Sequence, residues 1–339
     1  MNTTININPP QKGDPETSAD NGAAPQTMKA VRIHNYGGLD VLRYEDAPRP
    51  RPGAGEVLIR IHAAGVNPVD WKVREGYLKE LLPYSLPFIP GWDVSGVVQA
   101  TGPEAGRLKE RDEVYGMPDI SRDGAYAEYL VARESEIALK PKSLHHTHAA
   151  GVPMGALTAW QALFEAGQLR AGQRVLIHAG TGGVGHFAVQ LAKWKGAHVL
   201  ATASTTNQQL LRDLGADEPI DYTTQRFEDV VQDVDLVLDT MGGETQERSW
   251  KTLKKGGILV ALTGPPSAEA AQAHGVRATF HSSHPSAAQL AEIAALIDSG
   301  KLKPLIDRIV PLSEARHAQE LSQSGHTRGK IVLRVKDSV

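Results

Sequence analysis

The feature that most constrains the fold is a glycine pattern between a short apolar segment and an amphipathic one. Residues 175–179 are typical of a buried strand, and Gly180, Gly182 and Gly185 follow with the spacing G-x-G-x-x-G. Apolar residues then recur at the spacing of a half-buried helix: Val184, Phe187, Ala188, Leu191 and Ala192. A strand, a tight glycine turn and a helix in this order are typical of a fold that binds a dinucleotide.

Each glycine of this pattern has an expected role. Gly180 permits the turn, Gly182 lets the backbone approach a pyrophosphate, and Gly185 lets the helix pack closely on its strand. The amides at the start of the helix attract an anion. We therefore expect the whole loop to bind the cofactor: Gly180, Thr181, Gly182, Gly183, Val184 and Gly185. The alternative is a glycine turn with a structural role only.

The residues after the next strand, predicted over residues 198–203, favour NADP over NAD. Where NAD is preferred, an acidic residue stands there, but no Asp or Glu occurs from His186 to Arg212. In its place stand Ser204, Thr205 and Asn207, whose side chains can donate hydrogen bonds to a 2′-phosphate. A carboxylate would instead repel this phosphate. The same residues also suit a helix N-cap, and the two roles are compatible.

Composition narrows the functional classes. The chain has 339 residues, enough for two domains, and a formal net charge of −3, which gives no basic excess for nucleic acid. No apolar run reaches the length of about 18 residues that a membrane-spanning helix needs. The absence of cysteine removes every cysteine-based zinc site and is compatible with a reducing cytoplasm. Residues 1–27 lack a signal-peptide pattern and are expected to form a disordered tail.

The apolar pattern divides the chain into two parts. Up to about residue 150, short alternating segments separated by Pro and Gly turns predict a partly open barrel. Its strands are expected at residues 29–33, 57–62, 94–99, 113–116 and 125–131. From residue 151 to residue 299, helices alternate with strands, which predicts a doubly wound parallel sheet. The helices are expected at residues 149–166, 184–195, 207–214 and 246–253, and the strands at 175–179, 199–203, 236–239 and 258–262.

Two further segments follow from this division. Ligands bind parallel sheets at the carboxyl ends of the strands, so residues 239–243 and residues 262–265, which include Leu262 and Thr263, are candidates for cofactor contact. Their alternative role is ordinary turn chemistry. A last strand is predicted at residues 330–335, and we expect residues 300–339 to rejoin the N-terminal part, residues 28–150.

Several motifs resemble one known family. Residues 67–76 have the sequence NPVDWKVREG, residues 90–98 PGWDVSGVV, residues 155–160 GALTAW and residues 325–330 GHTRGK. With the glycine loop, and over roughly residues 28–335, they resemble the zinc-free quinone oxidoreductases and alkenal/enone reductases of the medium-chain dehydrogenase/reductase superfamily. The resemblance implies a GroES-like barrel with an inserted Rossmann domain, NADPH as cofactor and a homodimer. It also implies a small-molecule substrate, either a quinone or an α,β-unsaturated carbonyl.

The resemblance further implies roles for individual residues. Asn67 would lie beside the nicotinamide and the substrate carbonyl, and Thr158 would contact the cofactor at the domain junction. Tyr222 would cover the 2′-phosphate, while Gly329 and Lys330 would reach the nicotinamide end.

Three positions qualify the resemblance. Quinone reductases often carry a lysine three residues after the position of Ser204, and Asn207 stands there in this chain, so a weaker phosphate grip is expected. Asp93 stands in the region where zinc-dependent relatives hold their catalytic metal, so no metal is expected. Lys72 agrees better with the alkenal-reductase pattern and favours enones as substrates.

The expected reaction is hydride transfer from NADPH to an electron-poor acceptor, which requires positioning rather than a Lewis acid. Enolate charge that develops on the substrate needs a hydrogen-bond donor, and the candidates in order are Asn67, Lys72 and Tyr77. The alternative for Lys72 and Arg74 is a solvated surface charge, and for Tyr77 it is a packing role.

Two other functions share these sequence features. A non-catalytic NADPH-binding protein, either crystallin-like or redox-sensing, would carry the same glycine loop. A carbonyl or secondary-alcohol oxidoreductase would use the same cofactor on a C=O bond. The acceptor that the protein reduces, and the bond that is reduced, distinguish the three.

Overall fold

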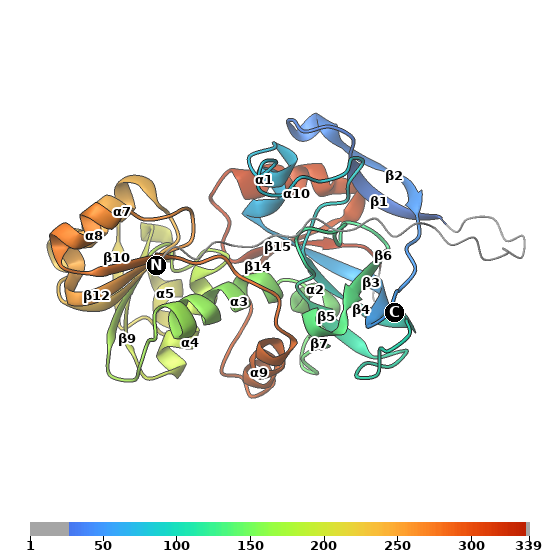
Figure 1. Cartoon of the computed structure of the whole chain (residues 1–339). Helices are drawn as coiled ribbons and strands as arrows, with labels where there is room; N and C mark the ends of the chain where they lie inside the picture. The colour runs from blue at the N-terminus through green and yellow to red at the C-terminus, as the bar shows by residue number, and fades with distance from the viewer. Residues whose placement is uncertain (1–26, 337–339) are drawn as a thin grey trace, which may run out of the picture.

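The computed structural model describes residues 27–336, so the tail expected over residues 1–27 lies outside the described residues apart from Thr27. Two lobes stand next to each other, one built on a seven-stranded sheet and the other on a six-stranded sheet (Figure 1). The fold is therefore mixed α/β, and the predicted fold class is confirmed.

The seven-stranded sheet holds most of the N-terminal strands. The strand bounds of this lobe are β1 Thr27–Ile33, β2 Leu42–Pro48, β3 Glu56–Val66, β4 Asp93–Thr101, β5 Glu113–Gly116, β6 Tyr129–Arg133, β7 Ile137–Leu139, β14 Ile306–Pro311 and β15 Lys330–Arg334. The order is β14-β15-β3-β4-β5-β7, with β6 paired to β3, and only β14 and β15 pair in parallel. Strands β1 and β2 form a separate antiparallel pair.

The six-stranded sheet of the other lobe is parallel throughout. Its strands are β8 Arg174–Ile177, β9 His198–Ala203, β10 Glu218–Asp221, β11 Val234–Asp239, β12 Leu253–Ala261 and β13 Arg277–Phe280. They lie in the order β10-β9-β8-β11-β12-β13. Alternate residues of β8 enter different apolar clusters: Val175 belongs to the cluster that includes Phe187, whereas Leu176 belongs to the cluster that includes Trp250. Both faces of the sheet are therefore covered, as in a doubly wound fold.

The helices connect these strands. Their bounds are α1 Pro68–Arg74, α2 His146–Ala149, α3 Pro153–Trp160, α4 Gly185–Trp194, α5 Gln208–Leu214, α6 Phe227–Val230, α7 Gly243–Ser249, α8 Ala268–His274, α9 Ala287–Asp298 and α10 Ala315–Gln323, with a π-helix at Gln161–Ala166. Short 3-10 helices cover Leu39–Val41, Glu134–Glu136, Thr205–Asn207, Trp250–Thr252 and Leu312–Glu314. No described helix combines the length and apolar character that a bilayer crossing requires.

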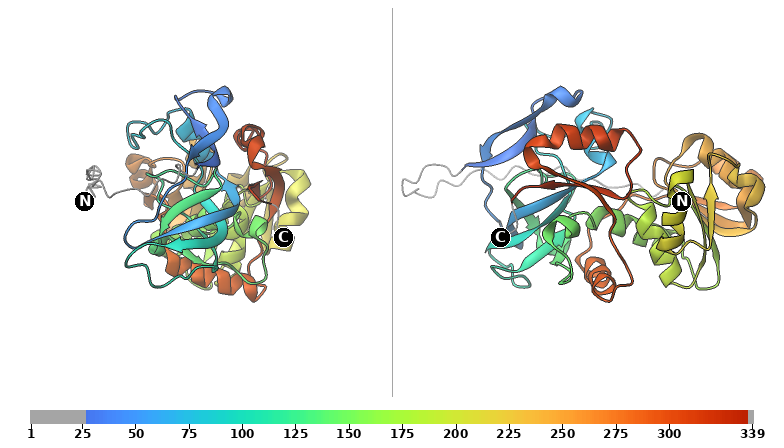
Figure 2. Two further views of the ribbon diagram at one scale, coloured as in Figure 1. Left: turned by 90° about the vertical axis from the view of Figure 1, so that its right-hand side faces the viewer. Right: turned by 180° about the vertical axis from the view of Figure 1, so that it is seen from behind.

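The C-terminal segment returns to the first lobe. Strand β15 pairs antiparallel with β3, with Ile331 opposite Val66 and Leu333 opposite Ala64. Helix α10 lies against α1 on the same lobe, as the front and back views agree (Figure 2). The prediction that the last strand rejoins the N-terminal part is therefore confirmed.

Several predicted elements differ from the structure in their bounds. The helix expected over residues 149–166 is divided, because Pro153, which has no backbone N–H, begins a new helix. The strand expected at residues 125–131 is β6 instead, because the Ala125 and Tyr126 amides donate to loop carbonyls of Gly91 and Pro90. The helix expected at residues 246–253 lies earlier, as α7, and its last predicted residue already starts β12.

Candidate cofactor and substrate site

The glycine loop joins β8 to α4 through close backbone contacts. A Cβ on Gly185 would lie 2.1 Å from the Ala179 carbonyl oxygen, so glycine is required for the expected close packing of this helix. A Cβ on Gly180 would lie 2.9 Å from the Cβ of Ala201. The positive φ of the turn, 48°, belongs to Ala179. Gly180 is therefore needed for packing, whereas the sequence suggested that the turn itself requires it.

Three amides of this loop are available to an anion. The backbone N–H groups of Thr181, Gly183 and Val184 donate no hydrogen bond to any described residue. They precede the ten-residue helix α4, whose dipole adds positive potential at this end. A Cβ on Gly182 would meet only Ala179 within 4 Å, so the loop is open on its other side. Free donors around an open turn fit a pyrophosphate.

The C-terminal segment lies directly against this loop. The Gly329 amide donates a hydrogen bond to the Thr181 carbonyl, with an N···O distance of 2.8 Å. Gly329 has φ +71°, and a Cβ there would lie 2.1 Å from the Leu305 carbonyl oxygen. A Cβ on Gly183 would lie 3.5 Å from Lys330 Cδ. The glycine loop of one lobe and the returning segment of the other therefore form one junction.

Asn67, Asp93 and Lys330 form a buried polar cluster beside this junction. Asn67 is 4% exposed, Lys330 3% and Asp93 0%. The Asn67 amide nitrogen donates to Asp93 Oδ2 at 2.9 Å, and the Lys330 ammonium donates to the same oxygen at 3.1 Å. The ammonium also donates to Asn67 Oδ1. The structure thus brings Asn67 and Lys330 together, and their contact with a cofactor stays a prediction.

Asp93 is held from a third side as well. Its Oδ1 accepts a hydrogen bond from the Met154 amide at 2.6 Å, in the first turn of α3. A Cβ on Gly65 would lie 2.8 Å from Asp93 Oδ2, so β3 can pass this carboxylate only with glycine. Sequence reasoning considered Asp93 only as a replacement for a metal motif. It missed the pairing with Lys330, because the two residues are 237 positions apart.

Asp70 lies at the start of α1 and contacts the cluster through the backbone N–H of Asn67. Its Oδ2 accepts hydrogen bonds from the Asn67 backbone N–H and from the Tyr126 hydroxyl, both at 2.7 Å. Its Oδ1 has no partner among the described residues. Complete burial raises the pKa of the Asp70 carboxyl to about 7. Sequence reasoning missed Asp70, although an N-cap Asn followed three residues later by an acidic residue is a capping-box pattern.

The other two donor candidates have no described contact with the cluster. Lys72 Nζ lies 5.7 Å from the centre of the Trp71 ring. Tyr77 is 67% exposed, and its ring meets Trp71 edge-on at a centroid distance of 6.0 Å. A hydrogen bond with Glu75 raises the pKa of the Tyr77 hydroxyl. Asn67 is therefore the one of the three that the structure places in the cluster.

Arg74 corrects one sequence expectation. A solvated surface charge is its alternative role in the sequence analysis, but the structure buries Arg74 completely. Its guanidinium donates to the Gly37 carbonyl at 3.1 Å and to Gln319 Oε1 at 2.9 Å, and it pairs with Glu75 at 2.6 Å. The physical reason is that α10 returns over α1 and covers a side chain that would face water on an isolated helix.

The residues predicted to bind the 2′-phosphate gather at the carboxyl ends of β9 and β10. Asn207 Nδ2 donates to Ser204 Oγ at 3.0 Å, and Thr205 is exposed beside them. The Tyr222 amide donates to the Ala203 carbonyl at 3.3 Å, so the two strand ends lie next to each other. The Tyr222 side chain is 58% exposed. We call residues 204–207 and Tyr222 the phosphate edge, because their exposed hydroxyls suit a phosphate.

For Thr158, Leu262 and Thr263, the structure shows contacts within the protein, and their role in cofactor binding stays a prediction. The Thr158 hydroxyl donates to the Met154 carbonyl at 2.6 Å within α3. The Leu262 amide donates to the Asp239 carbonyl at 2.9 Å, which places the end of β12 beside the end of β11. Thr263 follows at the surface.

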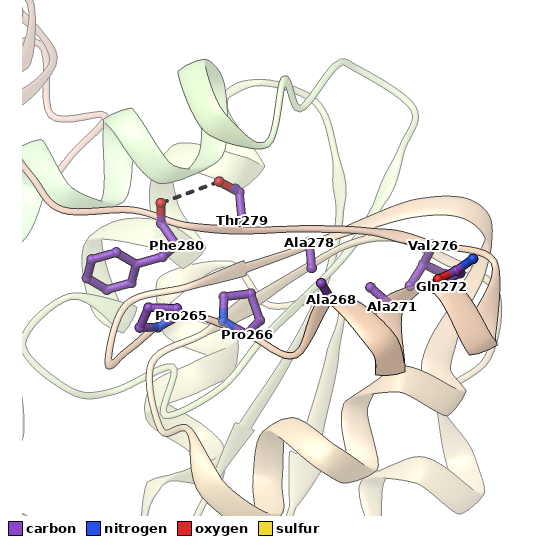
Figure 3. A pocket seen from close by; sticks show the side chains of 9 residues that line it. All are labelled: Pro265, Pro266, Ala268, Ala271, Gln272, Val276, Ala278, Thr279 and Phe280. Carbon is purple, nitrogen blue, oxygen red and sulfur yellow. Dashed lines mark hydrogen bonds between the residues drawn. The ribbon is translucent and has the colours of Figure 1, made fainter. Parts of the chain in front are cut away.

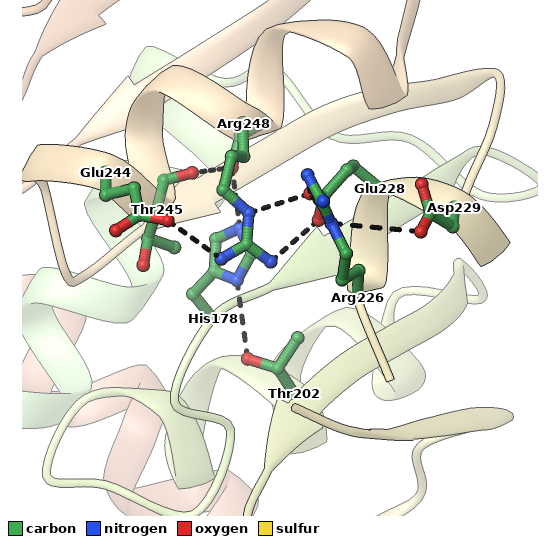
Figure 4. Close-up of polar contacts among 9 residues, drawn as sticks. His178, Thr202, Arg226, Glu228, Asp229, Glu244, Thr245 and Arg248 are labelled. Carbon is green, nitrogen blue, oxygen red and sulfur yellow. Dashed lines mark hydrogen bonds and ion pairs between the residues drawn. The ribbon is translucent and has the colours of Figure 1, made fainter. Parts of the chain in front are cut away.

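A polar network joins α6 to α7 next to His178, which follows β8 (Figure 4). His178 Nδ1 lies 3.3 Å from Thr202 Oγ1, and burial lowers the pKa of His178 to about 4, so the ring is neutral at pH 7. Arg248 donates to both oxygens of Glu228, at 2.9 and 2.7 Å, and Arg226 pairs with the same carboxylate. These bonds lower the pKa of Glu228 to about 2. We assign the network a supporting role, because its groups already have partners.

A cavity of about 490 Å³ lies elsewhere, between α8 and the edge strand β13 (Figure 3). It is lined by Pro265, Pro266, Ala268, Ala271, Gln272, Val276, Ala278, Thr279 and Phe280. None of these belongs to the glycine loop, to the buried cluster or to the phosphate edge. Within residues 27–336, no group of three or more His, Asp or Glu side chains is arranged to hold a metal ion.

Comparison with known proteins identifies the family. Residues 53–142 match the alcohol dehydrogenase GroES-like domain, and residues 214–333 match the family described as zinc-binding dehydrogenase. The chain is 38% identical over 323 residues to 2-methylene-furan-3-one reductase of Solanum lycopersicum, covering 91% of this chain and 79% of that protein. The chain belongs to the medium-chain dehydrogenase/reductase family.

Other members of the medium-chain dehydrogenase/reductase family are similar over nearly the same length. The NADPH-dependent alkenal/one oxidoreductase of Arabidopsis thaliana, a chloroplastic protein, is 38% identical, covering 91% of this chain and 80% of that protein. The solved structure of the quinone oxidoreductase from Coxiella burnetii superimposes with a TM-score of 0.86 at 36% identity, covering 92% of this chain and 100% of that chain. The family and the GroES-like and Rossmann-like lobes expected from the motifs are confirmed.

Proposed function

We propose that this medium-chain dehydrogenase/reductase is an NADPH-dependent enzyme that transfers hydride to quinones or to the C=C bond of α,β-unsaturated carbonyls. The observation that carries the proposal is the junction at which the open glycine loop meets the buried Asn67, Asp93 and Lys330 cluster. A dinucleotide held by the loop and reaching the cluster would span the two lobes. The names of the similar reductases support enones and quinones as acceptors.

The chain's own residues suggest how the substrate is activated. NADPH supplies the hydride when it is bound, and the free loop amides anchor its pyrophosphate. Lys330 and Asp93 hold the Asn67 amide in one orientation, because its oxygen accepts from Lys330 and one N–H donates to Asp93. The second N–H of Asn67 has no partner among the described residues. We propose it as the donor to the substrate oxygen on which enolate charge develops.

Zinc independence is part of this proposal. Both oxygens of Asp93 already accept hydrogen bonds, and the neighbouring charged group is the Lys330 ammonium, which would repel a cation. The chain also has no cysteine among its 339 residues. We expect full activity after treatment with a chelator and no stoichiometric zinc by elemental analysis. Activity that is lost with the chelator and regained with zinc would contradict the proposal.

The test of the function is NADPH oxidation with 9,10-phenanthrenequinone, 1,4-benzoquinone and a set of enones, followed by product analysis. We expect turnover and, for enones, saturation of the C=C bond. Tight NADPH binding without turnover on any acceptor would favour the non-catalytic NADPH-binding protein. Products reduced at C=O would favour the carbonyl or secondary-alcohol oxidoreductase.

We also propose a homodimer that forms through β13. This strand lies at the edge of the parallel sheet, and no described strand pairs with its outer side. Phe280 at its end is 44% exposed beside the apolar cavity of Figure 3. An exposed edge strand can pair with a second copy of itself. In sedimentation experiments we expect wild type to be a dimer and Phe280→Glu to be a monomer. The control Tyr44→Glu, on β2, should remain a dimer. A monomeric wild type would contradict the proposal.

We propose a cytoplasmic location. The lack of cysteine suits a reducing compartment, where disulfides are rare. The similar Arabidopsis protein is chloroplastic, so an organelle is the alternative. Fractionation of cells that express the full chain would distinguish the two.

A further inference from the structure

We propose that Arg328 binds the 2′-phosphate of the cofactor and replaces, from the opposite lobe, the lysine expected at the position of Asn207. The inference rests on the proposed function and adds to it a residue that determines cofactor specificity. Arg328 lies in the segment between α10 and β15, and its Nη2 is 3.5 Å from Thr206 Oγ1. The two residues are 122 positions apart in the chain.

The guanidinium of Arg328 is not committed to another group. Its side chain is exposed, and among the described residues its one polar contact is the Thr206 hydroxyl. Within the same part of the chain, it is the only basic side chain that hydrogen-bonds to residues 204–207. A planar guanidinium with five donors can bind two oxygens of one phosphate.

The departure at Asn207 also has a structural explanation. The side-chain amide of Asn207 is neutral and supplies no charge, and its nitrogen donates to Ser204 Oγ at 3.0 Å. This bond occupies a lone pair of the Ser204 hydroxyl, so its hydrogen is available either to Thr206 Oγ1, 3.4 Å away, or to a bound phosphate. Asn207 therefore orients the Ser204 donor, while the positive charge comes from Arg328.

A nearby carboxylate makes a cation necessary. Asp221 Oδ1 accepts a hydrogen bond from the Thr223 hydroxyl at 2.6 Å, and that hydroxyl lies 2.7 Å from Thr205 Oγ1. Hydrogen bonds from Thr205 and Thr223 hold the pKa of Asp221 below its usual value, so the carboxylate is charged at neutral pH. A phosphate dianion beside Thr205 would meet this charge unless a cation offsets it.

The position of Arg328 also links phosphate binding to the lobe junction. Arg328 contacts the phosphate edge, Gly329 bonds to the glycine loop, and Lys330 enters the buried cluster. Three consecutive residues of the returning segment thus touch three parts of the proposed cofactor site. Binding of the 2′-phosphate is therefore expected to order this segment against the Rossmann-like lobe.

The test is calorimetric titration with adenosine 2′,5′-bisphosphate and with 5′-AMP, which differ by the 2′-phosphate. We expect Arg328→Gln to weaken bisphosphate binding about 10- to 100-fold, as for loss of a charge-assisted hydrogen bond, and to leave 5′-AMP within about twofold. Arg328→Lys should recover part of the affinity, and Asp221→Asn should strengthen bisphosphate binding. The matched control is Arg308→Gln, an exposed arginine on β14, which should bind like wild type.

A second readout does not depend on affinity. In wild type, adenosine 2′,5′-bisphosphate should slow amide hydrogen exchange in residues 325–330, and in Arg328→Gln it should not. Unchanged bisphosphate affinity in Arg328→Gln, or an equal loss for both ligands, would overturn the role of Arg328. If wild type bound neither these ligands nor NADPH, the proposed function itself would fail, and this inference with it.

Discussion

Individual buried charges at the junction are partnered unequally. Asp93 has a cation and two further donors around it, whereas Asp70 has two donors and no cation in contact. Burial without a cation disfavours the charged form of Asp70 and raises the pKa of its carboxyl to about 7. Lys330 differs from Asp70, because its buried ammonium has an opposite charge in contact. It donates to the Asp93 carboxylate and to the Asn67 side-chain oxygen.

Asp70→Asn is expected to change the pH dependence of stability. The pKa of this carboxyl is about 7 in the folded state, against 3.8 for an aspartate in water, so between pH 3.8 and pH 7 the folded protein binds more protons than the unfolded chain. The contribution of Asp70 to the free energy of unfolding of wild type should therefore fall as the pH rises from about 4 to about 7. Urea unfolding at pH 5 and pH 8 should show a smaller fall for Asp70→Asn. The exposed Asp307→Asn is the control, and a fall equal to wild type in Asp70→Asn would contradict the assignment.

Lys330→Met is expected to destabilise the protein by about 3–5 kcal/mol, because it leaves the buried Asp93 charge without its cation. Adding Asp93→Asn to Lys330→Met should restore part of this loss, since the uncompensated charge is then removed. Urea unfolding of the two single variants and the double variant measures the coupling. Additive losses would show that the two side chains do not depend on each other.

Among the structural elements, the loop between β8 and α4 has the least tolerance. Helix α4 begins at Gly185, where the chain turns so closely that a Cβ would lie 2.1 Å from a backbone oxygen. The same approach brings the free loop amides together at the start of the helix. The packing of this element and its capacity to bind a phosphate therefore have one cause.

Gly185→Ala is expected to cost about 1–3 kcal/mol of stability through overpacking and to weaken NADPH binding, because α4 must move away from β8. The matched control is Gly106→Ala, where a Cβ would meet nothing within 4 Å and φ is not positive. Thermal unfolding and NADPH titration of both variants provide the measurement. Equal NADPH affinity in the two variants would argue against the loop as the pyrophosphate site.

For the molecule as a whole, contacts distant in sequence hold the part of the chain after β13 on the first lobe. Arg74 joins α1 to α10 across 245 positions, and the Tyr115 hydroxyl donates to the Leu290 carbonyl of α9 at 2.6 Å. Helix α9 thus contacts the barrel lobe although it follows the parallel sheet in sequence. The segment 328–330 at the cofactor junction is carried by this framework.

Arg74→Ala is expected to lower the free energy of unfolding by about 3 kcal/mol, because it leaves Gln319 and Glu75 without their buried partner. NADPH affinity of the folded variant should change by less than the stability does, since Arg74 touches no predicted cofactor residue. Urea unfolding and NADPH titration test this. A variant as stable as wild type would show that the α1 and α10 contact contributes nothing.

Local patterns in the sequence were sufficient for several features. The glycine spacing, the helical stripe after it and the alternating strands predicted the parallel sheet, because each reports what a residue faces within its own element. The return of the last strand to the N-terminal part was also predicted, and it is confirmed. Element bounds shifted where a proline or a competing loop partner took over the backbone, as at Pro153 and Tyr126.

The contacts that give the site its chemistry depend instead on how the chain returns. Asp93 and Lys330, Arg74 and Gln319, and Arg328 and Thr206 are each more than a hundred positions apart. No local periodicity connects such pairs, because the return of the C-terminal segment to the first lobe and to the lobe junction sets their distances. The type of each side chain was visible in the sequence, whereas its burial, its partner and hence its charge state follow from the folded arrangement.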